Sequence, residues 1–250
     1  MATVVQFRVG TSGWQYDDWR PGLYPAGVGQ PRWLGVYSAS FSTVEINSAF
    51  YRLPDRRQFE RWASAVTPGF CFAVKASRYL THVQRLREPA GPVQRLMERT
   101  EGLGDKTGPV LLQLPPTLHE DVDALDATLR AFPRSTRVAV EFRHRSWDTP
   151  AVRGVLERRG AATVMADRRG PLEPWWSTAD WGYVRFHEGR ARPTGCYGRV
   201  AIEQAAQRLA ERFSGASTVW IYFNNDRHGC AVSNARALRR RLSAAGHRVA

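Results

Sequence analysis

The chain of 250 residues has no long hydrophobic run and only three cysteines. A transmembrane helix needs about 20 consecutive, mainly apolar residues, so we expect no membrane segment. The first residues, MATVVQFRVG, resemble a strand and lack a secretory pattern, which predicts a cytoplasmic protein. Cys71, Cys196 and Cys230 are odd in number and far apart. They favour free thiols in a reducing compartment over a disulfide framework, and their spacing gives no zinc motif.

Lysine is almost absent. Only Lys75 and Lys106 are lysines, which leaves 34 of the 36 basic residues as arginines. Lys106 falls in a loop (GDKTG), whereas Lys75 ends an apolar, strand-like run. Arginine does not lose its proton at accessible pH, but a buried lysine can. A lysine retained at a strand end therefore indicates chemistry, or a compact point charge, that arginine does not supply.

The formal net charge of +13 invites a nucleic-acid or phosphate partner. The arginines are spread along nearly every helical segment, however, and form no single basic tract. This distribution favours a solvated arginine-rich surface over a dedicated nucleic-acid patch.

Eight apolar runs, separated by mostly helical segments, predict a closed parallel β/α barrel in a single domain over residues 1–250. The runs cover residues 7–12, 43–47, 70–75, 110–113, 138–143, 162–167, 183–187 and 219–225. Helical periodicity and caps predict helices over 55–66, 121–132, 149–159, 202–213 and 232–245. The sixth connection, DRRGPLEPWWSTADWG, has no helical period, so we expect its helix to be reduced or missing.

Nearly every run ends on polar or charged residues. In a β/α barrel these ends meet at one mouth, where active sites lie. A carboxylate facing the helix layer would be dry and unpaired, so we expect the charged side chains to point into the mouth. The candidates are Glu45, Asn47, Lys75, Gln113, Glu141, Arg143, Asp167, Arg185, His187, Asn224 and Asn225.

The loops add further candidates. The first connection is long, rich in Gly and Pro, and carries Trp14 and Tyr16. Loops of this length in a compact domain are often functional, so we expect it to roof the mouth. Tyr51, His82 and Trp147 follow strand ends on the same side and complete the set of predicted ligand-binding residues.

Several blocks resemble the YecE-like family, also called domain of unknown function 72. They are GTSGW (10–14), VEINSAFYRLP (44–54), FAVKAS (72–77), TH (81–82), LLQLPP (111–116), AVEFRHRSW (139–147), VRFHE (184–188) and YFNND (222–226). The resemblance runs from about residue 9 to residue 235 and implies a β/α barrel. It implies no particular reaction.

Three functions compete on these residues. The first is a metal-independent enzyme for a small polar, anionic ligand, with Lys75, Glu141 and Glu45 as catalytic residues and no cofactor. Glu141 would be a general acid or base, and Lys75 a Schiff-base nucleophile. The alternative for this pair is a structural ion pair across the barrel.

The second function is a divalent-metal hydrolase or isomerase of the endonuclease IV or xylose isomerase type. Its ligands would be Glu45, Glu141, Asp167 and His187. Neighbouring cations at Lys75, Arg143 and Arg185 count against it.

The third function is a phosphate- or nucleic-acid-binding protein without chemistry. It would use the loops after the seventh and eighth runs, because barrels often bind phosphate there. Asn224 and Asn225 would then bind the ligand or, alternatively, tie down the loop before the last helix.

Overall fold

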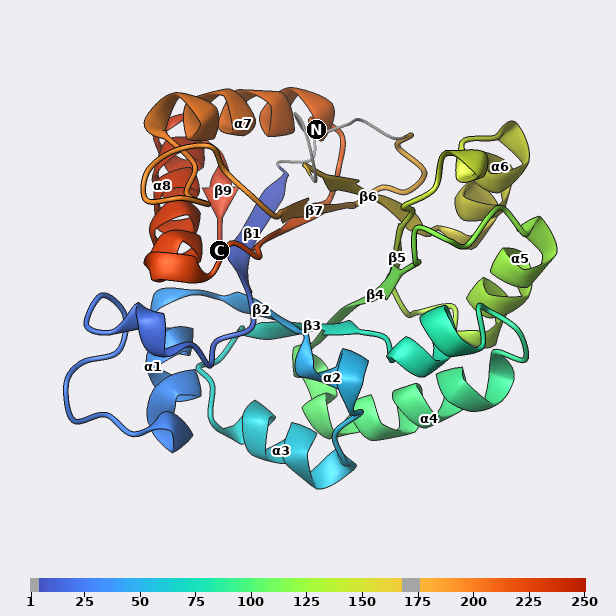
Figure 1. Ribbon diagram of the computed structural model, residues 1–250, viewed down its shortest axis with the longest axis horizontal. Helices are drawn as coiled ribbons and strands as arrows, with labels where there is room; N and C mark the ends of the chain where they lie inside the picture. The colour runs from blue at the N-terminus through green and yellow to red at the C-terminus, as the bar shows by residue number, and fades with distance from the viewer. Residues whose placement is uncertain (1–4, 168–175) are drawn as a thin grey trace.

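The computed structural model describes residues 5–167 and 176–250, which form a nine-stranded parallel sheet. Eight of its strands close into the predicted TIM-type barrel (Figure 1), because β1 pairs with both β8 and β2. The strands are β1 (Gln6–Ser12), β2 (Thr43–Ile46), β3 (Cys71–Lys75), β4 (Thr107–Gln113), β5 (Val138–Glu141), β6 (Ala162–Ala166), β7 (Gly182–Phe186), β8 (Thr218–Phe223) and β9 (Arg248–Val249).

The ninth strand lies beside the start of β1. Gln6 and Phe7 pair with Arg248 and Val249, whereas β1 pairs with β2 only at Thr11 and Ser12. The C-terminal residues therefore cover the part of β1 that β2 does not reach.

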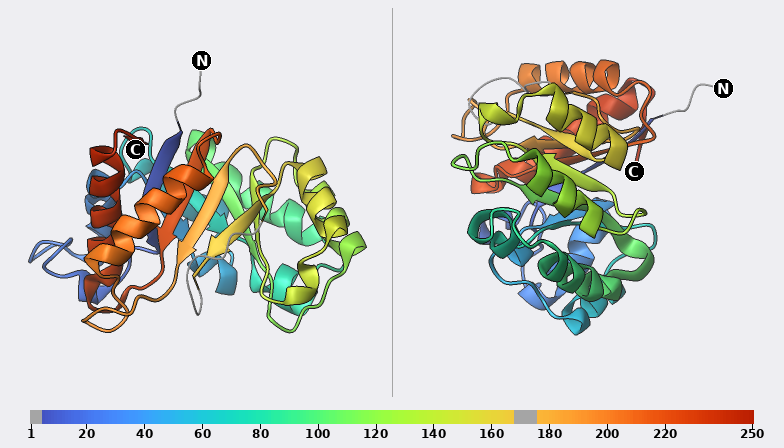
Figure 2. Two further views of the ribbon diagram at one scale, coloured as in Figure 1. Left: turned by 90° about the horizontal axis from the view of Figure 1, so that it is seen from above. Right: turned by 90° about the vertical axis from the view of Figure 1, so that its right-hand side faces the viewer.

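Helices surround the ring of strands, as the two further views also show (Figure 2). They are α1 (Trp33–Ser40), α2 (Ser48–Tyr51), α3 (Arg56–Ser64), α4 (Ala90–Thr100), α5 (Val122–Ala131), α6 (Pro150–Arg159), α7 (Arg199–Arg212) and α8 (Cys230–Ala244). All five predicted helices are present, with ends shifted by at most three residues at their starts or ends. None of the helices in the described residues is long and apolar enough to cross a membrane.

Local sequence signals explain where several helices begin and end. The carboxylates of Asp55 and Asp121 accept hydrogen bonds from backbone N–H groups in the first turns of α3 and α5, at 2.8 and 2.9 Å. Thr149 caps α6, which has Pro150 at its first position and stops at Gly160, a residue with left-handed backbone (φ 62°). Half of the sixth connection, residues 168–175, lies outside the described residues, and residues 176–181 form no helix.

One sequence-based expectation was wrong. Cys196 and Cys230 form a disulfide, which joins the β7–α7 loop to the first residue of α8, while Cys71 stays a free thiol. The two cysteines are 34 residues apart in the chain. They meet because α7 and α8 are packed neighbours on the barrel wall, a proximity that spacing along the sequence does not reveal.

Candidate functional site

Alternation along the strands divides the barrel interior into an apolar floor and a polar layer above it. Alternate side chains form a buried cluster inside the ring, among them Ala73, Leu111, Ala139, Tyr183 and Tyr222. The next inward position of β3, β4, β5 and β7, two residues further on, is polar in every case: Lys75, Gln113, Glu141 and Arg185. The polar layer therefore lies at the carboxyl ends of the strands, as predicted for a barrel mouth.

Arg185 lies at the centre of this layer, between two carboxylates. Its NH1 donates to Oε2 of Glu141 at 2.6 Å, and its NH2 donates to Oε1 of Glu45 at 2.8 Å. All three side chains are at most 1% exposed. Burial disfavours the charge on Arg185, but Glu45 and Glu141 outweigh that cost and raise the pKa of the guanidinium.

Further donors hold both carboxylates. Ser12 Oγ and Tyr183 Oη donate to the two oxygens of Glu45, each at 2.6 Å. Gln113 Nε2 donates to both oxygens of Glu141 at 3.1 Å, and Arg143 Nε donates to its Oε1 at 3.0 Å. Both carboxylates are therefore fixed acceptors within a buried network.

Lys75 is the exception in the polar layer. It is 8% exposed, and its Nζ lies 4.1 Å from the centre of the Phe50 ring. Within the described part of the chain, this Nζ has no hydrogen-bond or ion-pair partner. Burial lowers the pKa of Lys75 to about 8, with Arg185 adding to the decrease and Glu45 and Glu141 opposing it. The ion pair that sequence suggested between Lys75 and Glu141 is replaced by the pairs that Glu141 makes with Arg185 and Arg143.

Arg143 and His82 lie near the Lys75 amine on the side of β3 and β5. His82 belongs to a π-helical turn, Tyr79–Val83, and its ring packs edge-on against Phe50 at 5.0 Å. Burial lowers the pKa of His82 to about 4, and the positive charges of Arg143, Lys75 and Arg78 lower it further. This side of the mouth therefore carries a concentrated positive potential.

Polar amides lie on the opposite rim. Asn47 Nδ2 donates to Asn224 Oδ1 at 3.4 Å, and Asn224 Nδ2 lies 3.3 Å from Nδ1 of His187. These three predicted residues, which directly follow β2, β8 and β7, come together near Glu141, whose Oε1 is 4.0 Å from Nε2 of His187. They form a polar edge that can orient a ligand.

The predicted aromatic residues divide into two groups. Tyr16 donates to the backbone oxygen of Ser12 at 2.9 Å, and Tyr51 is 82% exposed on α2, so both lie near the mouth. Trp14 instead packs against Trp62 of α3, with ring centres 5.2 Å apart. Trp147 is fully buried and donates to the backbone oxygen of Leu118. Trp14 and Trp147 are thus core residues, contrary to the sequence-based placement.

Asp167 was also placed wrongly. It lies one position past the inward-facing residues of β6, so its side chain points towards α7. There it accepts hydrogen bonds from the backbone N–H of His187, at 2.7 Å, and from the hydroxyl of Tyr197. These two hydrogen bonds offset the cost of burying a carboxylate on the helix side of the strand, which is the cost that had predicted an inward orientation. Burial raises the pKa of Asp167, although both hydrogen bonds oppose that change.

Asn225, like Asp167, lies one residue past the inward-facing position of its strand and so points to the helix side. Its Nδ2 donates to the backbone oxygen of Gly195 at 2.9 Å and to Asn234 of α8 at 3.0 Å. The predicted phosphate-binding loops after β7 and β8 are thus tied to each other through Asn225 and Asn234. Of the two asparagines, only Asn224 faces the mouth.

The four metal ligands of the alternative hypothesis do not converge. Arg185 lies between Glu45 and Glu141, and Asp167 points to the outer face of β6. Across residues 5–167 and 176–250, no group of three or more His, Cys, Asp or Glu side chains is arranged to hold a metal ion.

Two contributors, Tyr183 and Phe50, were not among the sequence-based candidates, whereas Ser12 is the polar end of the first predicted strand. Ser12 and Tyr183 complete the hydrogen bonding of Glu45, and Phe50 provides the aromatic face under Lys75. Tyr183 could have been identified, because it lies two residues before Arg185 and so faces the same interior. Phe50 could not, since it belongs to α2, a single helical turn without a periodic pattern.

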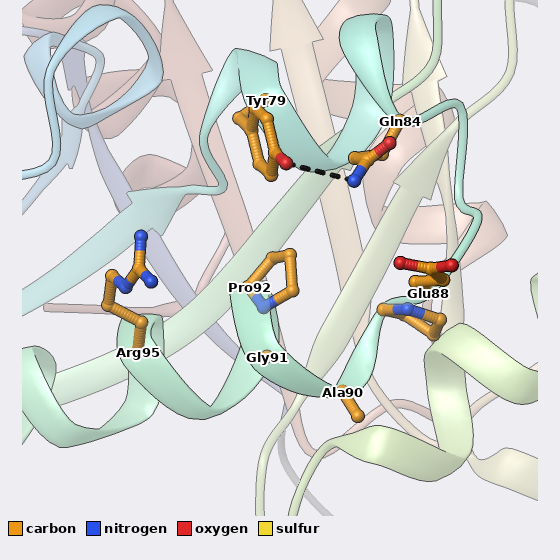
Figure 3. A pocket seen from close by; sticks show the side chains of 8 residues that line it. Tyr79, Gln84, Glu88, Ala90, Gly91, Pro92 and Arg95 are labelled. Carbon is orange, nitrogen blue, oxygen red and sulfur yellow. Dashed lines mark hydrogen bonds between the residues drawn. The ribbon is translucent and has the colours of Figure 1, made fainter.

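A separate cavity of about 540 Å³ lies between the π-helical turn and the start of α4 (Figure 3). Tyr79 and Gln84 form one wall, joined by a hydrogen bond of 2.9 Å, and Pro92 and Arg95 of α4 line another. Its lining includes none of the charged residues of the polar layer, so we treat it as distinct from the candidate site.

Comparisons with known proteins agree with this architecture. The family model described as "Protein of unknown function DUF72" matches residues 8–250. The UPF0759 protein YunF of Bacillus subtilis is 25% identical to this chain over 92% of each sequence. A crystal structure of a DUF72 family protein from Thermotoga maritima is 27% identical, with a TM-score of 0.83, and covers 95% of this chain and 99% of its own. SacUVDE shares the fold alone, with 9% identity and a TM-score of 0.58 over 98% of this chain and 99% of its own.

Proposed function

Because the chain belongs to the DUF72 family, whose description names no reaction, we propose its function from the site itself. The protein is an enzyme that binds a small, polar, anionic substrate with a carbonyl group at the barrel mouth. Lys75 is its nucleophile, and the reaction needs no metal ion.

The observation that carries this proposal is the buried amine of Lys75, which has no hydrogen-bond or ion-pair partner in residues 5–167 and 176–250. A lysine with a purely structural role would form an ion pair with Glu45 or Glu141, but Arg185 already bridges these two carboxylates. With a pKa of about 8, roughly one-tenth of the amine is neutral at pH 7. That fraction is about 300 times larger than for an ordinary lysine, and only the neutral amine is a nucleophile.

The charges at the mouth support an anionic substrate. Lys75, Arg143 and Arg185 oppose the two carboxylates of Glu45 and Glu141, which leaves one net positive charge when all are ionised. Arg143 has only its Nε bonded within the described residues, so its terminal nitrogens can receive a carboxylate or phosphate. Asn47 and Asn224 offer amides to the polar part of the same ligand.

Each group then has a distinct role in the reaction. The neutral Lys75 amine adds to the carbonyl carbon, and loss of one water leaves an imine that takes up a proton. The Glu45–Arg185–Glu141 network keeps the mouth rigid and sets the potential at Nζ, so we assign the glutamates a positioning role in place of acid–base catalysis.

Borohydride trapping tests the proposal. The protein is incubated at pH 8 with small 2-oxo acids and aldehydes, such as pyruvate and glyoxylate, then reduced and mapped by mass spectrometry. We expect at least one probe to give an adduct on the peptide that contains Lys75. The Lys106→Arg variant should keep this adduct, because Lys106 bonds the backbone oxygen of Ala63 away from the mouth. Labelling of Lys75 no faster than of Lys106 across the panel would contradict the proposal.

A further inference from the structure

We propose that Lys75 is also a carbamylation site, at which carbon dioxide adds reversibly to Nζ and converts the lysine into an anion. This inference rests on the same Lys75 amine as the proposed function. It goes beyond that function because it changes the charge, and hence the ligand preference, of the mouth.

The surroundings of Nζ suit a small, apolar reactant. The amine lies on the face of Phe50 and is 8% exposed, so a three-atom molecule can reach it without displacing an ion pair. Burial and the nearby guanidinium of Arg185 favour the neutral amine, which is the form that reacts with carbon dioxide.

The polar layer also has donors that lack acceptors. Within the described residues, the buried Nε of Arg185 has no hydrogen-bond partner, and Arg143 uses only its Nε. A buried donor without an acceptor costs free energy, and a charged one costs more. A carbamate on Lys75 would bring two anionic oxygens into the region that these guanidinium groups influence.

The charges that face Nζ come from several elements. Arg185 on β7 and Arg143 after β5 favour a new anion. His82 in the β3–α4 connection, whose pKa is lowered to about 4, is neutral at pH 8 and adds no positive charge. Glu45 on β2 and Glu141 on β5 oppose the new anion. Each glutamate, however, is already bonded to a guanidinium within 3.0 Å, so its repulsion is that of an ion pair and weaker than that of a bare charge.

The chemistry balances without an oxidant or a cofactor. The nitrogen lone pair forms a bond to the carbon of carbon dioxide, one C=O π bond becomes a carboxylate, and the amine proton leaves to solvent. The modified residue changes the net charge of the five groups Lys75, Arg143, Arg185, Glu45 and Glu141 from +1 to −1. The mouth would then disfavour the anionic substrate, so carbon dioxide should compete with carbonyl probes for Lys75.

The scarcity of lysine makes a direct test possible. Protein at pH 8 is equilibrated with ¹³C-bicarbonate, and carbamate signals are recorded by ¹³C NMR. Only Lys75, Lys106 and the α-amino group can contribute, and a double Lys75→Arg/Lys106→Arg variant reports the α-amino group alone. We expect one additional carbamate that persists in Lys106→Arg and disappears in Lys75→Arg. In Arg143→Gln, which keeps the amine, its occupancy should fall several-fold.

The outcomes separate this inference from the proposed function. A spectrum of the unmodified protein identical to that of the double variant would overturn carbamylation. If carbonyl probes still label Lys75 in that case, the proposed function stands without the modification. A carbamate at Lys75 without any carbonyl adduct would support the inference and contradict the proposed nucleophile.

Discussion

At the scale of single residues, Lys75 and Arg185 have opposite relations to the fold. Arg185 is buried between two carboxylates that it bridges. Lys75 is buried near cations, and its Nζ has no hydrogen-bond or ion-pair partner among the described residues. A buried cation that is paired, such as Arg185, stabilises the buried carboxylates beside it. A buried cation such as Lys75, with other cations nearby, lowers the free energy of unfolding, and a cost of this sort is typical of functional positions.

We therefore predict that Lys75→Met makes the protein more stable at pH 7, by about 1 to 3 kcal/mol. The pKa of Lys75 is lowered in the folded protein to about 8, so the unfolded chain binds more protons between pH 8 and about 10.5. The charged amine thus destabilises the fold fully below pH 8, and this effect disappears as the pH approaches 10.5. Denaturant unfolding at pH 7 and pH 10 measures the difference, which should shrink at the higher pH.

Arg185→Met provides the matched control, because it makes the same change in a paired cation. It leaves Glu45 and Glu141 buried without their shared guanidinium, and should cost about 3–5 kcal/mol. Equal losses in both variants would mean that Lys75 is a structural residue like Arg185.

The sequence predicted which residues belong to the site better than it predicted how those residues pair with one another. The two lysines of the composition pointed to Lys75, and strand ends pointed to Glu45, Glu141 and Arg185. The ion pairs among these residues could not be predicted. Each pair depends on the relative positions of strands that are far apart in the sequence.

At the scale of elements, strand alternation explains both the successes and the errors. Residues two apart along β3, β4, β5 and β7 share the interior, which brings Lys75, Gln113, Glu141 and Arg185 together. Asp167 and Asn225 lie one residue past that register and so face α7 and α8. Their polarity suggested the mouth, but their hydrogen-bond partners come from neighbouring elements that sequence does not place: Tyr197 donates to Asp167, and Asn234 accepts from Asn225.

The disulfide between the β7–α7 loop and α8 yields a prediction at this scale. A cross-link that closes a loop of this length contributes roughly 3 to 4 kcal/mol by limiting the unfolded chain. We expect a reducing agent to lower the denaturant midpoint of the unmodified protein and of Cys71→Ser, which keeps the cross-link. The double Cys196→Ser/Cys230→Ser variant should be less stable and insensitive to the reductant. An unmodified protein whose midpoint does not move on reduction would disprove the contribution.

At the scale of the whole molecule, the fold was predictable because the barrel repeats one pattern. The eight apolar runs correspond to β1 to β8, and the ring that their number predicted closes because β1 pairs with both β2 and β8. The short pairing of β9 with β1 carries no comparable signal, since two residues give no periodicity. The positive charge of the chain remains a prediction about surface solvation; i,i+4 pairs such as Arg56–Glu60 and Arg153–Glu157 are consistent with it.

The central claim is that the barrel buries one reactive lysine amine, which has no ion-pair partner in the described part of the chain, and the pKa of Lys75 tests it most directly. Protein labelled with ¹³C-lysine gives two lysine side-chain signals, and Lys106→Arg assigns them without further work. A pH titration of the Cε resonance should place the midpoint of Lys75 near 8. A midpoint at the ordinary lysine value, about 10.5, would show that the amine is paired or solvated, and would contradict the account.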